Sequence, residues 1–202
     1  MHRLWKLWLG TAASLTLAYY LVNNTPTSKL VLYNGLGLLA LVMLLTGIKV
    51  NKIRPPAPWL WLAAGLASFL VADVIYYVLE LQSAPEEPPF PNWADFFYLM
   101  MYPLVSVGLT KMVRSVSPGR NLPTMIDAAV VGIAMFGILY VLFIDSNFEG
   151  DSGLSWALVV SVAYPVMDVA LLAVAARLAV TVHLKHPPFA LITLAIISLA
   201  IA

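Results

Sequence analysis

Hydrophobic residues along the chain gather in long uninterrupted runs, with polar residues between them. The complete runs hold about 20 residues or more, the length a helix needs to cross the roughly 30 Å hydrocarbon core of a bilayer. A membrane β-barrel would instead show strands of about ten residues with every second position polar. The pattern therefore predicts an all-α fold, a polytopic transmembrane helix bundle. The expected spans are residues 4–22, 30–48, 59–81, 94–113, 123–144, 154–180 and 189–202.

The segments between these runs are short and rich in Pro, Asn, Ser and Gly, as turns are, so residues 1–202 are expected to form one membrane domain. The last run, 189–202, is still apolar at Ala202 and would form only about 21 Å of helix. We therefore expect the chain to be a fragment of a longer protein. If the missing part lies in the cytoplasm, the whole membrane unit has an even number of spans, at least eight.

Composition narrows the class of protein further. Of the 202 residues, 61% are hydrophobic and 10% are charged, and the formal net charge is +1. Soluble domains carry about 25% charged residues, so this chain is expected to have the lipid bilayer as its partner. No nucleic-acid partner is expected, because a basic face is missing. With no Cys and only three His, we expect no metal site and no cofactor.

The basic residues fall in alternate turns of the predicted bundle. All but Lys29 lie on the side of the N-terminus, which predicts by the positive-inside rule that the N-terminus is cytoplasmic. Arg3 and Lys6 before an apolar run also suit a signal peptide, but no small-residue cleavage site follows, so the run is interpreted as a retained span. The basic residues on the N-terminal side are Arg3, Lys6, Lys49, Lys52, Arg54, Lys111, Arg114, Arg120, Arg177 and Lys185.

Two expected spans with the same direction share a short pattern. Tyr102-Pro103 lies in the fourth span and Tyr164-Pro165 in the sixth, and each run continues to a basic residue. A second similarity links 54–74 with 186–202, where Ser68 corresponds to Ser198. The direction of both similarities indicates a parallel repeat of helical hairpins, although apolar helices also resemble one another by chance.

Two carboxylates lie inside predicted spans. Asp73 is in the third span and Asp168 is in the sixth. A charged side chain at mid-bilayer costs at least about 2.5 kcal/mol, so such residues usually face the bundle interior and bind a partner, for instance a Tyr hydroxyl. From their positions the two lie at depths that differ by very roughly 10 Å, which makes a shared dicarboxylate site doubtful. They are interpreted either as a proton- or ligand-responsive site or as hydrogen bonds that join helices.

Two further features are candidates for signal sensing. Pro103 and Pro165 each remove a backbone hydrogen bond within a span, and the hydroxyls of Tyr102 and Tyr164 could point to the polar spot that results. Ordinary shaping of membrane helices explains the prolines equally well. The segment 90–95 opens the fourth span. Asn92 or Asp95 is expected to cap the helix, and Trp93 is expected to lie at the membrane surface. The segment as a whole is also a candidate for the lip of an external ligand pocket.

A family resemblance rests on short motifs between residues 59 and 202. These are PNWADFFYL at 91–99 with YPL at 102–104, LPTMIDAA at 122–129 and AYPVMD at 163–168. Together they resemble the N-terminal multi-pass segment that precedes GGDEF and EAL domains in bacterial diguanylate cyclases and cyclic-di-GMP phosphodiesterases. The resemblance implies a sensory or anchoring role in the bacterial inner membrane, with a cytoplasmic output domain in the same chain, and it is compatible with a homodimer. No GGDEF or EAL motif is present in the 202 residues, so any catalysis belongs to sequence outside them.

Other classes of protein remain open from the sequence. A small proton-coupled carrier would use Asp73 and Asp168 as relay groups. A retinal-binding receptor needs a Lys in its seventh span, and residues 189–202 contain none. An intramembrane enzyme would need a nucleophile and base, and the common nucleotide-binding, hydrolase and metalloprotease motifs are absent.

Overall fold

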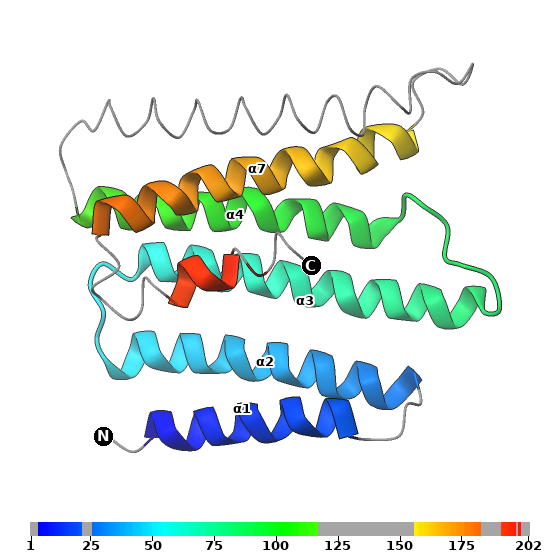
Figure 1. Ribbon diagram of the computed structural model, residues 1–202, viewed down its shortest axis with the longest axis horizontal. Helices are drawn as coiled ribbons and strands as arrows, with labels where there is room; N and C mark the ends of the chain where they lie inside the picture. The colour runs from blue at the N-terminus through cyan, green and yellow to red at the C-terminus, as the bar shows by residue number, and fades with distance from the viewer. Residues whose placement is uncertain (1–3, 22–25, 117–155, 183–190, 197, 199–202) are drawn as a thin grey trace.

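Helices make up the part of the chain that the structure describes. The computed structural model describes residues 4–21, 26–116, 156–182, 191–196 and 198 (Figure 1). Residues 191–196 are also helical, and no strand occurs within these ranges. The all-α prediction is therefore confirmed for the described residues. The long helices are α1 (Leu4–Leu21), α2 (Pro26–Val50), α3 (Ala57–Ser83), α4 (Trp93–Val116) and α7 (Trp156–Val182).

Four of the described helices are long and apolar enough to cross a membrane. They correspond to the spans predicted at 30–48, 59–81, 94–113 and 154–180, although 154 and 155 lie outside the described residues. The four segments are Leu30–Val50, Ala57–Ser83, Trp93–Ser115 and Trp156–Ala179.

The other three predicted spans are not shown. The segment predicted at 4–22 forms the helix α1 but is not one of the four, since its 18 residues include Lys6 and several Thr and Tyr residues that lower its hydropathy. The span predicted at 123–144 lies outside the described residues, as does half of 189–202. The structure thus supports four spans of the seven expected from the sequence.

The helices lie in a row, in which α1 packs on α2, α2 on α3, α3 on α4, and α4 on α7 (Figure 1). Consecutive helices from α1 to α4 are antiparallel, whereas α4 and α7 run in the same direction. The fourth and sixth predicted spans share one direction as well, so the parallel pair agrees with the alternation expected from the sequence.

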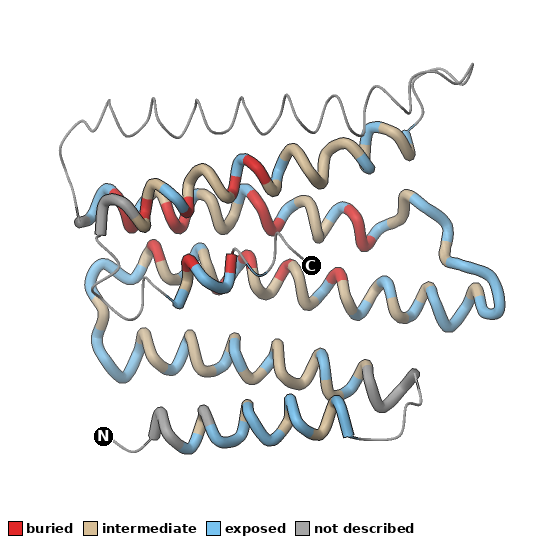
Figure 2. Tube along the Cα trace, viewed as in Figure 1, coloured by how far each residue is buried: buried red, intermediate tan, exposed pale blue. Residues whose placement is uncertain are grey.

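The buried core lies where α3, α4 and α7 meet, and Figure 2 shows buried residues on these helices and on the short C-terminal helix but none on α1 or α2. Ile196 of the short helix belongs to the same cluster. Since membrane helices gain little from hiding apolar surface, tight packing carries much of their association. The fully buried large side chains are Leu109, Met112, Val113, Leu171 and Leu178.

Small residues let α3 and α4 approach closely. A Cβ at Gly108 would lie 2.9 Å from the carbonyl oxygen of Pro58, and one at Gly65 would lie 2.5 Å from a methyl group of Val105. The hydroxyl of Ser68 donates a hydrogen bond of 2.7 Å to the carbonyl oxygen of Phe97. Small residues and interhelical hydrogen bonds of this kind are typical of helix pairs in membranes.

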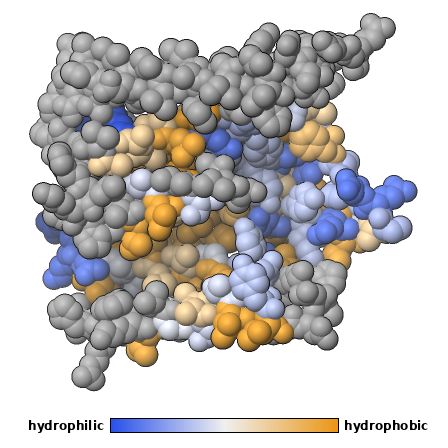
Figure 3. Space-filling view, viewed as in Figure 1, coloured by the Kyte–Doolittle hydropathy of each residue, from blue (hydrophilic) through white to orange (hydrophobic). Residues whose placement is uncertain are grey.

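Charged residues gather at the two ends of the bundle, where the helices begin and end. We call the end where α3 ends and α4 and α7 begin the acidic end, and the opposite end the basic end. Figure 3 shows strongly hydrophilic residues over the loop between α3 and α4 and near the turn between α2 and α3. The acidic end carries Glu80, Glu86, Glu87 and Asp95, and the basic end carries Lys49, Lys52, Arg54, Lys111, Arg114 and Arg177.

Candidate signal-sensing site

Three carboxylates of the bundle, one buried and two half-buried, each accept a hydrogen bond from a tyrosine of a neighbouring helix. On the side of α3, the hydroxyl of Tyr98 on α4 donates to Oδ1 of Asp73 at 2.7 Å. The ring of Tyr98 also contacts Phe69 edge-on, with ring centroids 5.4 Å apart. A hydroxyl donor partly replaces the water that the carboxylate loses in an apolar environment.

The parallel helices α4 and α7 are joined by two such bonds. Tyr164 on α7 donates to Oδ1 of Asp95 on α4 at 2.6 Å, and Tyr102 on α4 donates to Oδ1 of Asp168 on α7 at 2.8 Å. Each helix therefore supplies one tyrosine and one aspartate. Because the two bonds lie at successive levels, a shift or rotation of α7 along α4 would change both of them at once.

Four of the seven candidate residues from the sequence are thus brought together as partners of one another, and a fifth pairs with a residue outside the set. Asp95 pairs with Tyr164, Asp168 pairs with Tyr102, and Asp73 pairs with a tyrosine that the sequence analysis had not selected. Asp73 and Asp168 bind different tyrosines and share no hydrogen bond with each other. These contacts are compatible with both interpretations given above, a responsive site or a structural link between helices.

The suggested direction of the tyrosine hydroxyls was wrong. Tyr102 and Tyr164 do not donate to backbone groups beside Pro103 and Pro165 but to carboxylates across the helix interface. A carboxylate is the stronger acceptor, and the charge-assisted bond outweighs one to a neutral carbonyl. Both prolines lie inside continuous helices, and Pro103 is exposed while Pro165 is half-buried.

The start of α4 forms a cap from the residues expected for it. Oδ1 of Asn92 accepts the backbone N–H of Ala94 at 2.8 Å, and Oδ2 of Asp95 accepts the backbone N–H of Asn92 at 2.7 Å. This reciprocal arrangement satisfies donors that a helix start leaves free. Asp95 therefore has two roles, since one oxygen completes the cap and the other binds α7.

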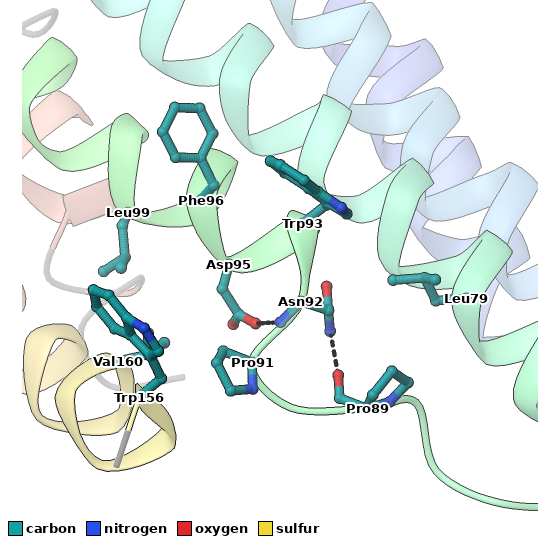
Figure 4. Close-up of a pocket in the computed structure, with 10 residues that line it drawn as sticks. All are labelled: Leu79, Pro89, Pro91, Asn92, Trp93, Asp95, Phe96, Leu99, Trp156 and Val160. Atoms are coloured by element: carbon teal, nitrogen blue, oxygen red, sulfur yellow. Dashed lines mark hydrogen bonds between the residues drawn. The ribbon is translucent and has the colours of Figure 1, made fainter. Parts of the chain in front are cut away.

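A cavity of about 710 Å³ opens at the acidic end, beside this cap (Figure 4). Its walls come from the end of α3, the loop that leads into α4, and the first turns of α4 and α7. Asp95 is 8% exposed, whereas Trp93 and Trp156 are 76% and 77% exposed, as residues at a membrane surface often are. The ten residues that line the cavity are Leu79, Pro89, Pro91, Asn92, Trp93, Asp95, Phe96, Leu99, Trp156 and Val160.

Sequence reasoning missed Tyr98 and Trp156 as parts of this region. Tyr98 lies four residues before Tyr102, so both side chains project from the same face of α4. This spacing could have indicated that Tyr98 is a further donor to a carboxylate. Trp156 has no comparable signal in the sequence. Its place beside the start of α4 follows from the packing of α7 on α4, which no local pattern encodes.

Two buried acceptors in the spans have no hydrogen-bond partner, Oδ2 of Asp73 and Oδ1 of Asn34. Asp73 is half-buried in α3 and keeps only its bond to Tyr98. Within the described ranges no group of three or more His, Asp or Glu could hold a metal ion.

Fold and site together define a helical membrane protein whose carboxylates are bound across helix interfaces by tyrosines. Searches against models of known protein families, curated proteins and solved structures found no match.

Proposed function

We propose that this chain is the membrane-embedded sensory and anchoring module of a bacterial signalling protein. The observation that carries the proposal is the pair of reciprocal tyrosine–aspartate bonds between α4 and α7, one of which lies directly beside the cavity. A ligand that changed the surroundings of Asp95 would alter the bond to Tyr164, and the parallel helices would transmit the change towards their other ends. Two discrete packings of one helix pair are a common basis for such switching.

The proposed topology places the basic end in the cytoplasm and the acidic end outside, with seven or more spans in the bacterial inner membrane. Its support is the gathering of the described basic residues at one end, which matches the positive-inside rule. In this orientation the cavity faces the exterior, and α4 and α7 end on the cytoplasmic side. A signal from outside would then reach a cytoplasmic domain through the C-terminal halves of α4 and α7.

The proposed output is a cytoplasmic domain in the same chain that makes or degrades cyclic-di-GMP, acting as a homodimer. This part rests on the resemblance of residues 59–202 to segments that precede GGDEF and EAL domains. Extending the reading frame beyond codon 202 tests it directly. A GGDEF or EAL motif downstream is the expected result, and a frame that encodes neither would overturn this output.

The test of sensing uses the complete protein in a bacterial strain with low background cyclic-di-GMP. Asp168→Asn and Tyr102→Phe weaken or remove one α4–α7 bond, and we expect each to change the nucleotide level several-fold at equal membrane abundance. Glu80→Gln, an exposed carboxylate on α3, is the matched control and is expected to leave the level unchanged. Unchanged levels in both α4–α7 variants would contradict the proposal and leave these bonds as structural links.

A second candidate function is a small proton-coupled carrier, which the unpartnered Oδ2 of Asp73 favours. A buried carboxylate in a span that can gain and lose a proton is the usual relay group of such proteins. Reconstitution of the chain in liposomes with an internal pH dye separates the two candidates. Proton uptake that Asp73→Asn abolishes would support a carrier, and uptake equal to that of empty liposomes would exclude it.

A further inference from the structure

The cavity at the acidic end has the size and the lining of a small-molecule site. Its volume of about 710 Å³ lies within the roughly 300–1,000 Å³ that is usual for ligand pockets. Asn92 and Asp95 are the only polar residues among the ten that line it. A pocket with apolar walls and one carboxylate selects a ligand with an apolar body and one complementary polar group.

The carboxylate of Asp95 retains acceptor capacity for such a group. Its two oxygens offer about four acceptor positions, and the hydroxyl of Tyr164 and the backbone N–H of Asn92 each fill one. Both donors are neutral, and the positive N-terminal end of the α4 dipole offsets only part of a full negative charge. A positively charged group would therefore gain Coulomb attraction in a partly desolvated site, where such attraction is stronger than in water.

A tryptophan lies beside the carboxylate. Figure 4 shows the carboxylate of Asp95 on the side of Trp156, at the start of α7, whereas the indole ring of Trp93 projects from the opposite side of the first turn of α4. Both indole rings are largely exposed and line the cavity. The face of an indole ring attracts ammonium groups, and aromatic rings around a carboxylate are suited to substituted ammonium ions.

We propose that this cavity binds an organic cation, a substituted ammonium group that carries an apolar substituent. The nitrogen faces Asp95, and its substituents contact the indole ring of Trp156 and the apolar walls. An anionic ligand would be repelled by Asp95, and a purely apolar ligand would leave the remaining acceptor positions unpaired. The inference deepens the sensory role proposed above and rests on it for its biological consequence, whereas binding itself is measurable without it.

Isothermal titration of the chain in a neutral, non-ionic detergent tests the proposal. The probes are benzyltrimethylammonium (cation), benzyl alcohol (neutral) and benzylsulfonate (anion). We expect the cation to bind at least about tenfold more tightly than either of the others. Equal affinities, or no measurable binding of the cation, would overturn the proposal.

Variants locate the site. Asp95→Asn keeps an acceptor for Tyr164 but removes the charge, and we expect it to weaken cation binding at least about tenfold. Trp156→Leu is expected to weaken binding about three- to tenfold and to keep the fold, because the side chain is 77% exposed. Glu86→Gln removes a nearby exposed charge outside the cavity and is expected to change affinity less than twofold. A larger effect of Glu86→Gln than of Asp95→Asn would mean diffuse attraction only and would overturn the site.

The ammonium group has two natural sources, a water-borne molecule or a choline headgroup of a lipid. Nanodiscs of phosphatidylglycerol and of phosphatidylcholine distinguish them, since only the second lipid would compete with the probe. Competition assigns the site to a headgroup, and its absence assigns it to a water-borne ligand; both results support the ammonium chemistry. If the cation binds but leaves the cyclic-di-GMP level of the complete protein unchanged, the sensory role fails and the binding site stands.

Discussion

The hydroxyl of Tyr102 on α4 lies 2.8 Å from Oδ1 of Asp168 on α7, and the two residues are 66 positions apart in the chain. The second α4–α7 bond, from Tyr164 to Asp95, runs in the opposite sense between the same two helices. Each helix is thus both donor and acceptor. Such a pair fixes the register of two parallel helices more firmly than apolar packing, because a one-turn slip would break both bonds.

The Tyr102–Asp168 bond is expected to contribute a measurable coupling energy. Tyr102→Phe and Asp168→Leu each leave one partner buried and unpaired, so each is expected to lower the free energy of unfolding by about 1 kcal/mol or more. The double variant is expected to be more stable than the sum of the single effects predicts, by about 0.5–1.5 kcal/mol, since both partners are then apolar. Denaturation in mixed micelles provides the four values of the cycle.

The control for this cycle is Tyr76→Phe, which removes an exposed hydroxyl from α3 and is expected to change stability by less than about 0.5 kcal/mol. Additive effects of the two changes at the interface would show that the bond does not couple α4 to α7.

Gly108 is expected to tolerate no larger residue. Gly108→Ala would place a Cβ 2.9 Å from the backbone oxygen of Pro58, which cannot move aside as a flexible side chain can. The strain is expected to lower the free energy of unfolding by about 1–3 kcal/mol. Gly35→Ala on α2 meets no atom within 4 Å and is expected to be neutral or to stabilise by up to about 1 kcal/mol. Equal melting temperatures of the two variants would contradict the close packing of α3 on α4.

The cap at the start of α4 depends on Asn92. Asn92→Ala removes the acceptor for the N–H of Ala94 and is expected to destabilise the protein by about 0.5–2 kcal/mol. Asn92→Asp keeps an acceptor at the same place and is expected to retain most of the stability. Amide hydrogen exchange in the first turn of α4 measures the effect locally, and unchanged protection in Asn92→Ala would rule out this capping role.

The proposed orientation predicts opposite accessibility at the two ends. The chain has no cysteine, so Glu86→Cys and Lys52→Cys each provide one reactive thiol at an exposed position. In intact bacterial cells a membrane-impermeant maleimide is expected to label Cys at 86 at once and Cys at 52 only after permeabilisation. The reverse pattern would place the N-terminus outside.

Local sequence was sufficient for the features that depend on neighbours in the chain. The apolar runs predicted α2, α3, α4 and α7 to within a few residues, because hydropathy over about 20 positions is a strong signal. The cap by Asn92 and Asp95 was also expected, since capping involves residues three positions apart. The span expected at 4–22 forms a helix but is not among the four membrane-length apolar helices of the described residues, so it stays a prediction.

The tyrosine partners could not be assigned in the same way. That Asp73 and Asp168 need a donor follows from the cost of an unpaired carboxylate in an apolar medium, but several tyrosines lie at suitable depths. The choice of Tyr98 for Asp73, and of Tyr102 for Asp168, depends on which helices touch and how each is rotated about its axis.

The amino-acid sequence by itself determined that this protein is helical and built for a bilayer, because a helix satisfies its own backbone hydrogen bonds and needs only enough apolar length to cross. The tertiary structure alone decided which carboxylate meets which hydroxyl, and that Trp156 of α7 lies beside Asp95 of α4 at one cavity. These relationships arise from helix packing between residues far apart in the chain, where small residues and shape complementarity, rather than hydropathy, select one arrangement.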